Sequence, residues 1–176
     1  MKENRTIIEK KLNELKRSKR LKLEKITIGN DLESLVGKCD QFCPQIEKFQ
    51  RILTNQLSPF EREEKMFKSF SRDSNFVEEE LRTEETLVNC WKELLEILSL
   101  EFKSKSKPNL LKIYQFLFDK SKSIRQDVQI QRLSSPLIVE IYQQISFFFF
   151  FFFLSIFFLI FFESSFSHYF RISVVE

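Results

Sequence analysis

The chain has 176 residues, which is enough for one compact domain but not for two. Its net charge of +3 conceals a basic start, because Met1 to Lys25 carry ten Lys and Arg against four Asp and Glu. A single histidine, His168, and only two glycines, Gly29 and Gly37, argue against histidine-assisted nucleophiles and glycine-rich phosphate loops, so we expect no enzyme activity and no cofactor.

The first predicted element is a helix from Glu3 to about Lys25, inside a basic arm of residues 1–30. Apolar residues at helical spacing around Leu12 lie on one face, so we expect an arm that is either mobile or docked through this face. The cluster LKRSKRLK makes the arm a candidate for RNA binding or nuclear import, and a solvated helix face explains the same charges equally well. The candidate RNA-binding residues are Lys16, Arg17, Lys19 and Arg20.

Four prolines each precede a run with helical periodicity. They predict helix starts, because an N–H in the first turn of a helix has no partner within the helix and proline can lack it at no cost. These prolines are Pro44, Pro59, Pro108 and Pro136. After Pro59, the spacing of Phe60, Phe67 and Phe70 predicts a helix with one aromatic stripe. Ser58 and Ser135 are the expected N-terminal caps of two of these helices.

The clearest helix follows Thr83, which we expect to cap it. Its apolar stripe consists of Leu87, Trp91, Leu94, Leu95 and Leu98. The charged linker KSKSKP then leads to a long helix, and a last one is expected from Pro136 to Ile145. Short connections between helices with one apolar stripe each predict an all-α fold of stacked helical pairs.

The end of the chain, residues 147–176, is rich in phenylalanine and allows three interpretations. Phe, Leu, Ser and Ile share pyrimidine-rich or T-rich codons, so translation through an intron end after Ser146 would produce this composition. A membrane tail anchor is the second interpretation, although the 16 residues from Phe147 to Phe162 span about 24 Å as a helix against roughly 30 Å of bilayer core. A soluble core element is the third.

Three cysteines occur in a chain whose start lacks the features of a secretory signal, so we expect free thiols rather than disulfides. Cys39 and Cys43 would give zinc only two of its four ligands, and we therefore expect no metal site. The third cysteine is Cys90.

Three ordered motifs resemble the GANP family, which is named for germinal-centre-associated nuclear protein and includes the yeast suppressor-of-actin relative. In VGKCDQFCPQIEKFQR the matching residues are Gly37, Cys39, Cys43, Pro44, Glu47, Lys48 and Arg51. In EKMFKSFSRDS they are Lys68, Phe70 and Arg72. In FLFDKSKSIRQDVQIQ they are Phe116, Asp119, Ile124, Arg125 and Asp127, while Lys120 and Lys122 replace family arginines. A shorter match is LRTEETL, before the clearest helix.

The resemblance covers residues 36–146. In the family, a helical layer is followed by a winged-helix end, and these residues would form the first half of that scaffold. The resemblance implies a non-enzymatic scaffold that binds protein partners of an mRNA-export complex, and RNA as well, in the nucleus or at the nuclear pore. One alternative function, which rests on the apolar tail, is a membrane tail-anchored helical adaptor. The other, implied by the resemblance because shorter relatives are linked to centrosomes and spindles, is a role of this chain at those structures.

Overall fold

The computed structural model describes the backbone of residues 2–29, 35–73, 75–103 and 109–172, and the side chains of residues 5–25, 35–73, 75–103 and 109–154. This part of the chain contains helices, turns and no β-strand, so the predicted all-α fold is confirmed. Its elements are α1 (Lys2–Gly29), α2 (Gln45–Leu53), the short 3-10 helix η1 (Glu78–Glu80), α3 (Glu84–Lys103), α4 (Leu110–Gln131) and α5 (Pro136–Ile172). By its contacts the chain divides into two units, Met1–Ile138 and Val139–Glu176.

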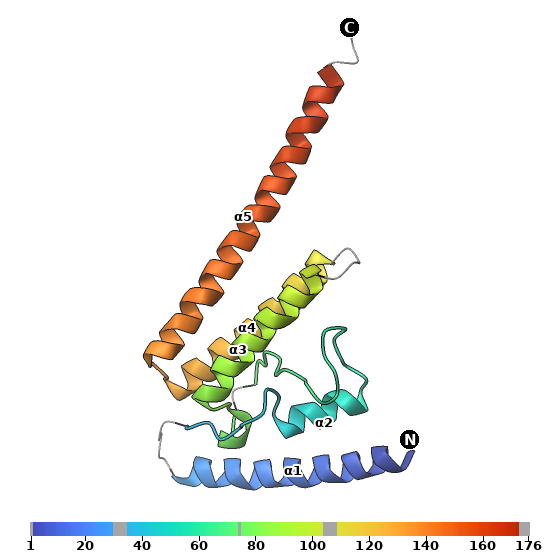
Figure 1. Cartoon of the computed structure of the whole chain (residues 1–176). Coiled ribbons are helices and arrows are strands. Elements are labelled where there is room, and N and C mark those ends of the chain that lie inside the picture. The colour runs from blue at the N-terminus through green and yellow to red at the C-terminus, as the bar shows by residue number, and fades with distance from the viewer. Residues whose placement is uncertain (1, 30–34, 74, 104–108, 173–176) are drawn as a thin grey trace. The chain divides into compact units, whose positions relative to one another are not determined.

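The first helical pair in unit 1 consists of α1 and α2, which lie against each other (Figure 1). Leu12 is the buried residue of the predicted apolar face of α1, and Leu15 is half-buried. Pro44 immediately precedes α2, as expected from its fixed φ of −58°. The predicted docking of the arm through its apolar stripe is therefore seen.

The second pair consists of α3 and α4, which run side by side (Figure 1) and hold the apolar core. The core side chains that are at most 1 % exposed on these helices are Leu87, Cys90, Trp91, Leu94, Ile113, Leu117 and Ile124. Thr83 caps α3, because its Oγ1 accepts a hydrogen bond from the N–H of Thr86 at 3.2 Å. The cap of α4 is Asn109, whose Oδ1 accepts from the N–H of Lys112 at 3.0 Å.

The helix that we expected after Pro59 is wrong, because the described residues between α2 and η1 form turns and extended backbone. Single turns close locally, as where the N–H of Glu61 donates to the Ser58 carbonyl at 3.0 Å, but other N–H groups donate to distant elements. The N–H of Lys68 donates to the Phe42 carbonyl at 2.9 Å, and that of Phe70 to Asp119 Oδ1 at 3.3 Å. The fully buried Phe67 stacks on Phe42, with ring centroids 5.4 Å apart, so the aromatic residues serve tertiary packing.

Helix α5 begins at Pro136 as predicted, and Ser135 caps it by accepting from the N–H of Ile138 at 3.3 Å. The prediction that it ends near Ile145 is wrong, since the sequence after Pro136 has no glycine or further proline to stop a helix. Aromatic rings one turn apart stack along it, as in Phe147 and Phe151 at 6.4 Å. By length and composition, the 19 residues Pro136–Leu154 suffice to span a membrane.

Candidate functional site

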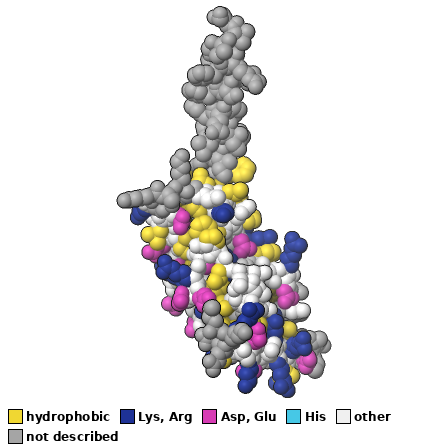
Figure 2. Space-filling view, turned by 90° about the vertical axis from the view of Figure 1, so that its right-hand side faces the viewer, with side chains coloured by type: hydrophobic (Ala, Val, Ile, Leu, Met, Phe, Trp, Pro, Cys, Tyr) yellow, Lys and Arg dark blue, Asp and Glu magenta, His cyan; other side chains and the backbone are white. Residues whose placement is uncertain are grey.

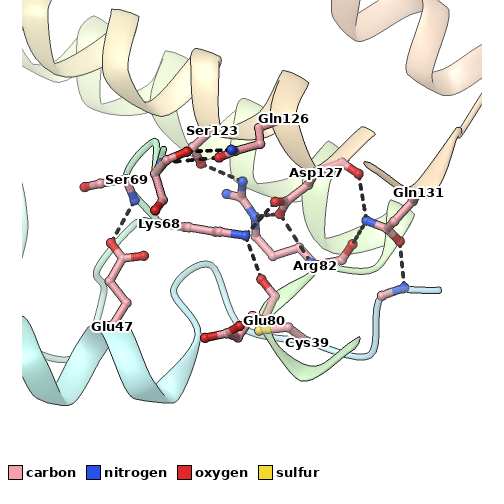
Figure 3. Close-up of polar contacts among 12 residues, drawn as sticks. Cys39, Glu47, Lys68, Ser69, Glu80, Arg82, Ser123, Gln126, Asp127 and Gln131 are labelled. Carbon is pink, nitrogen blue, oxygen red and sulfur yellow. Dashed lines mark hydrogen bonds and ion pairs between the residues drawn. The ribbon is translucent and has the colours of Figure 1, made fainter. Parts of the chain in front are cut away.

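The motif residues converge on a buried charged cluster in unit 1, centred on the Asp127 carboxylate of α4 (Figure 3). Its Oδ1 accepts a hydrogen bond from Lys68 Nζ at 2.6 Å, and its Oδ2 accepts from Arg82 Nε at 2.7 Å. The backbone N–H of Arg82 also donates to Oδ2, at 3.3 Å. None of the three side chains is more than 3 % exposed. The cluster thus joins α4 to the segment between α2 and η1, residues 54–77, which we call the irregular segment. It also joins α4 to the turn that precedes α3.

The two cations of this cluster make further contacts, which a buried ion pair needs in order to offset the loss of water. Arg82 Nη2 donates to Ser123 Oγ at 2.7 Å, and its Nη1 donates to Cys90 Sγ at 3.4 Å. Burial works against the charge of Arg82, but Asp127, Cys90 and Glu47 together outweigh it and raise the guanidinium pKa. Lys68 Nζ also donates to the Glu80 carbonyl at 2.7 Å. Every polar group of the cluster is therefore used inside the fold.

Gly37, the first residue of the first motif, lies against the same cluster. Its N–H donates to Gln131 Oε1 at 2.7 Å, and Gln131 Nε2 donates to the Arg82 carbonyl at 2.9 Å. A Cβ built on Gly37 would meet three oxygens at 2.6 Å, two of which are backbone carbonyls. Only glycine fits this close approach. The Cys39 N–H continues the attachment by donating to the Leu81 carbonyl at 2.9 Å.

A second charged cluster holds the irregular segment against α2. Arg51 pairs with the buried Glu61 carboxylate, and its Nη1 donates to the Phe67 carbonyl at 2.9 Å. The N–H of Phe67 in turn donates to Glu61 Oε1 at 2.9 Å. Burial opposes the charge of Glu61, yet the hydrogen bond from Arg51 and the nearby Lys120 lower its pKa. Lys120, which replaces a family arginine, donates to Ser69 Oγ at 2.6 Å.

Glu47 and Asp119, one from each of two motifs, act as acceptors for the backbone of the segment between them. Glu47 Oε1 accepts from the N–H of Ser69 at 2.8 Å. Burial raises the pKa of Glu47, although this hydrogen bond works in the opposite direction. The second lysine that replaces an arginine, Lys122, lies over the Phe70 ring with Nζ 3.8 Å from the centroid. Both lysines have therefore found contacts suited to a point charge.

The three cysteines are buried free thiols, and burial is the main cause that raises the pKa of each. A thiol with a raised pKa is a poor nucleophile and a poor metal ligand at neutral pH. Within the described ranges, no three His, Cys, Asp or Glu side chains come together as they would around a metal ion. The three cysteines therefore act as buried packing residues.

Most of the site residues singled out by the motifs meet in or beside these two clusters. They are Gly37, Cys39, Cys43, Pro44, Glu47, Arg51, Lys68, Phe70, Asp119 and Asp127. The side chain of Arg72 is exposed, and that of Arg125 is half-buried. Four of their partners are not predicted from the sequence, and these are Glu61, Arg82, Ser123 and Gln131. One signal was present, because Asp127 and Gln131 lie on the same helical face as Ile124 and Val128 and so had to be buried with partners.

The four candidate RNA-binding residues of α1 have different surroundings. Lys19 is half-buried, and its Nζ lies 2.8 Å from Glu80 Oε2 and 3.7 Å from Asp73 Oδ2. Lys16, Arg17 and Arg20 are exposed. Their role as RNA ligands stays a prediction.

A groove runs between α1, α2 and the irregular segment of unit 1. It has a volume of about 1110 Å³. Its lining includes the apolar side chains of Leu12, Ile46 and Phe76. It also includes charged side chains of both signs, among them Lys16, Arg20, Asp73 and Glu80. The groove is therefore a concave surface with an apolar lining and charges of both signs.

Comparison with protein families gives a match of residues 42–156 to the SAC3/GANP family. The match begins inside the first motif, at Phe42, and includes the second and third motifs completely. It ends at Ile156, inside the phenylalanine-rich stretch, so the domain boundary placed at Ser146 stays a prediction. Because this match spans more than half of the sequence, the chain belongs to the SAC3/GANP family.

Proposed function

We propose that this protein is a non-enzymatic scaffold that acts in nuclear messenger-RNA export by binding protein partners. The observation that carries the proposal is the inward use of the family motifs. Lys68, Arg82 and Asp127 bind one another at 2.6–2.7 Å and have no more than 3 % of their side chains exposed. Buried motif residues stabilise the fold, so we expect partner proteins to bind the surface residues that this fold positions.

We further propose that the exposed cations of α1 contact RNA phosphates. Lys16, Arg17 and Arg20 are exposed, and two of them border the groove. Three contacts to a single strand should make the binding constant fall with salt, with a logarithmic slope of about −2. Replacing all three by alanine should remove that slope. The matched control replaces Lys10, Lys11 and Lys25, which are exposed on the same helix.

The alternative function is a membrane-anchored helical adaptor, and the apolar stretch Pro136–Leu154 favours it. Fractionation of cells that express the tagged full chain separates the two functions. Recovery with nuclear or pore proteins, together with co-purified export proteins, supports the scaffold. Resistance to carbonate extraction from non-nuclear membranes, with no such proteins co-purified, supports the adaptor and would overturn the export role.

A further inference from the structure

Two lysines of α1 bind the acidic 3-10 helix η1. Lys19 Nζ donates to Glu80 Oε1 at 3.0 Å and lies 2.8 Å from Glu80 Oε2, and Lys22 pairs with Glu79. Asp73 Oδ2 lies 3.7 Å from Lys19 Nζ. The hydrogen bond from Lys22 is the main cause that lowers the pKa of Glu79, so the pair favours the charged carboxylate. We call the contacts of Lys19 and Lys22 with η1 the arm latch.

Lys19 lies on the face through which α1 docks. Leu12, Leu15 and Leu23 are seven, four and four residues away from it, a spacing that places these side chains on the same side of a helix. Leu12 is buried, and the other two leucines are half-buried. The Lys19 side chain itself is 19 % exposed. Lys19 therefore cannot serve as an RNA ligand while α1 is docked.

The second half of α1 carries more positive charge than the arm latch uses. Residues 16–25 contain six Lys and Arg and a single acidic residue, Glu24. Three of these cations, the proposed RNA ligands Lys16, Arg17 and Arg20, are exposed. Figure 2 shows Lys and Arg side chains, with Asp and Glu among them, gathered at the lower end of the view, which is where α1 lies in Figure 1. The docked arm therefore presents part of its charge to solvent and keeps the rest paired.

Apolar packing holds α1 only in part. Among its described side chains, those of residues 5–25, Leu12 is the only one that is buried. The family match begins at residue 42, so α1 lies outside the matched region. Partly exposed ion pairs weaken when salt screens them or when another ion competes for them. An anion that binds Lys19 and Lys22 therefore favours the release of α1.

We propose that the arm latch is an autoinhibitory contact, in which the η1 carboxylates occupy lysines that RNA phosphates would otherwise bind. This inference rests on the proposed contact between α1 and RNA. Complete RNA binding then requires α1 to leave η1, so the apparent affinity is lowered by the fraction of chains whose arm is free. The coupling is reciprocal, and RNA must raise that fraction by the same factor. RNA is favoured over an acidic protein segment because its backbone carries a charge at every nucleotide and can meet several of these cations together.

Cys39 is a native reporter of the release of α1. Its side chain is 8 % exposed, and it lines a pocket of about 250 Å³ whose lining also includes Leu15 and Lys22 of α1. Release of α1 would open this pocket, so Cys39 should then react faster with a thiol reagent. Cys90, which is fully buried in α3, should react only when the core unfolds and serves as the internal control.

The test variant is Glu79→Gln with Glu80→Gln, which removes both carboxylates of the arm latch and keeps the size of the side chains. Glu63→Gln with Glu64→Gln is the matched control, because it removes two exposed carboxylates from the irregular segment. The full chain in a mild detergent is labelled with and without polyuridylate, and the modified cysteines are identified by mass spectrometry.

Without RNA, we expect Cys39 of the test variant to be labelled about three- to tenfold faster than in the native chain and the control, since two partly exposed ion pairs shift an equilibrium by about this factor. The test variant should also bind polyuridylate more tightly by a similar factor. In the native chain, saturating polyuridylate should speed the labelling of Cys39 and leave that of Cys90 unchanged. High salt without RNA should speed it as well, because salt screens the arm latch.

The RNA contact and the arm latch fail in different ways. If the native chain does not bind polyuridylate, the RNA contact fails and the inference fails with it. If polyuridylate binds but the test variant binds it no more tightly than the matched control, or if bound RNA leaves the labelling of Cys39 unchanged, the arm latch is not inhibitory although the RNA contact stands. Release by poly-glutamate and not by polyuridylate would overturn the inference and indicate an acidic protein partner.

Discussion

Replacing Asp127 by asparagine removes the carboxylate that binds both Lys68 and Arg82 while keeping the size of the side chain. In the intact chain this carboxylate accepts at 2.6 Å from Lys68 and at 2.7 Å from Arg82. Asparagine has one oxygen and one NH₂ group, so one of the two cations would face a donor. The variant would leave two buried positive charges without a counterion.

The loss of unfolding free energy in Asp127→Asn follows from these two uncompensated charges. Breaking a buried ion pair by removing one partner costs about 3 to 5 kcal/mol, because the remaining charge is buried uncompensated. Lys68→Met should cost less, about 1 to 3 kcal/mol, since it removes hydrogen bonds but leaves Arg82 and Asp127 as a neutral pair. Domains of this kind have a total unfolding free energy of about 5 to 15 kcal/mol. Asp127→Asn should therefore bring the chain close to unfolding.

The assay is urea unfolding of the full chain in a mild detergent, followed by circular dichroism and by the emission of Trp91, the only tryptophan. Asp73→Asn is the matched control, because Asp73 is 51 % exposed and lies 3.7 Å from Lys19, and it should change stability by less than about 0.5 kcal/mol. The predicted order of cost is Asp127→Asn, then Lys68→Met, then Asp73→Asn. Equal costs for Asp127→Asn and Asp73→Asn would refute the reasoning that this cluster holds the fold.

Three further predictions concern packing and protonation. Trp91→Ala should lower the unfolding free energy by about 3 to 5 kcal/mol and Phe102→Ala by little, since Trp91 is 1 % and Phe102 54 % exposed; similar melting temperatures for both would show that the α3 stripe is not core. Gly37→Ala should lower the unfolding free energy by about 1 to 3 kcal/mol, because the new Cβ meets backbone carbonyls at 2.6 Å. Val36→Ala, at an exposed position, should leave it nearly unchanged. A Gly37→Ala variant as stable as the native chain would contradict the close approach. Burial raises the pKa of Glu47, so its charge costs stability at neutral pH, and this cost disappears as the pH falls through the raised value toward the ordinary 4.5. Glu47→Gln should thus be at least as stable as the native chain at neutral pH and lose its advantage in acid, and a variant that is less stable at neutral pH would reverse the sign.

The helices were predictable from the sequence because each is a local pattern. In the stripe that contains Trp91, Leu87, Trp91 and Leu94 are buried where the periodicity placed them, while Leu95 and Leu98 are half-buried. Proline and cap residues located the starts of α2, α3 and α5 for the same local reason.

The irregular segment was not predictable in this way, because non-local hydrogen bonds decide its path. Phe67 and Phe70 recur near helical spacing, yet the N–H groups nearby donate to Glu47 and Asp119, which are 22 and 49 residues away from their donors. Helix propensity depends on neighbouring residues only, so it gives no information about such distant partners. The early end assigned to α5 has a different origin, since the composition after Ser146 was interpreted by its codons and not by its helix-forming pattern.

The candidate site was predictable as far as the motif resemblance reached. It identified Lys68 and Asp127 but not their shared partner Arg82, although the short match LRTEETL contains that arginine. Arg82 precedes the cap Thr83, and a charged residue next to a helix start is usually solvated. Its burial becomes evident only when α4 supplies the carboxylate.

The most direct measurement is the distribution of polyadenylated RNA in cells depleted of this chain. The proposed scaffold role predicts that polyadenylated RNA accumulates in the nucleus, and that the native chain and the Asp73→Asn control restore its export. Asp127→Asn should fail to restore export, because the surface that partners recognise depends on the buried cluster. An unchanged distribution of polyadenylated RNA after complete depletion would contradict the export role.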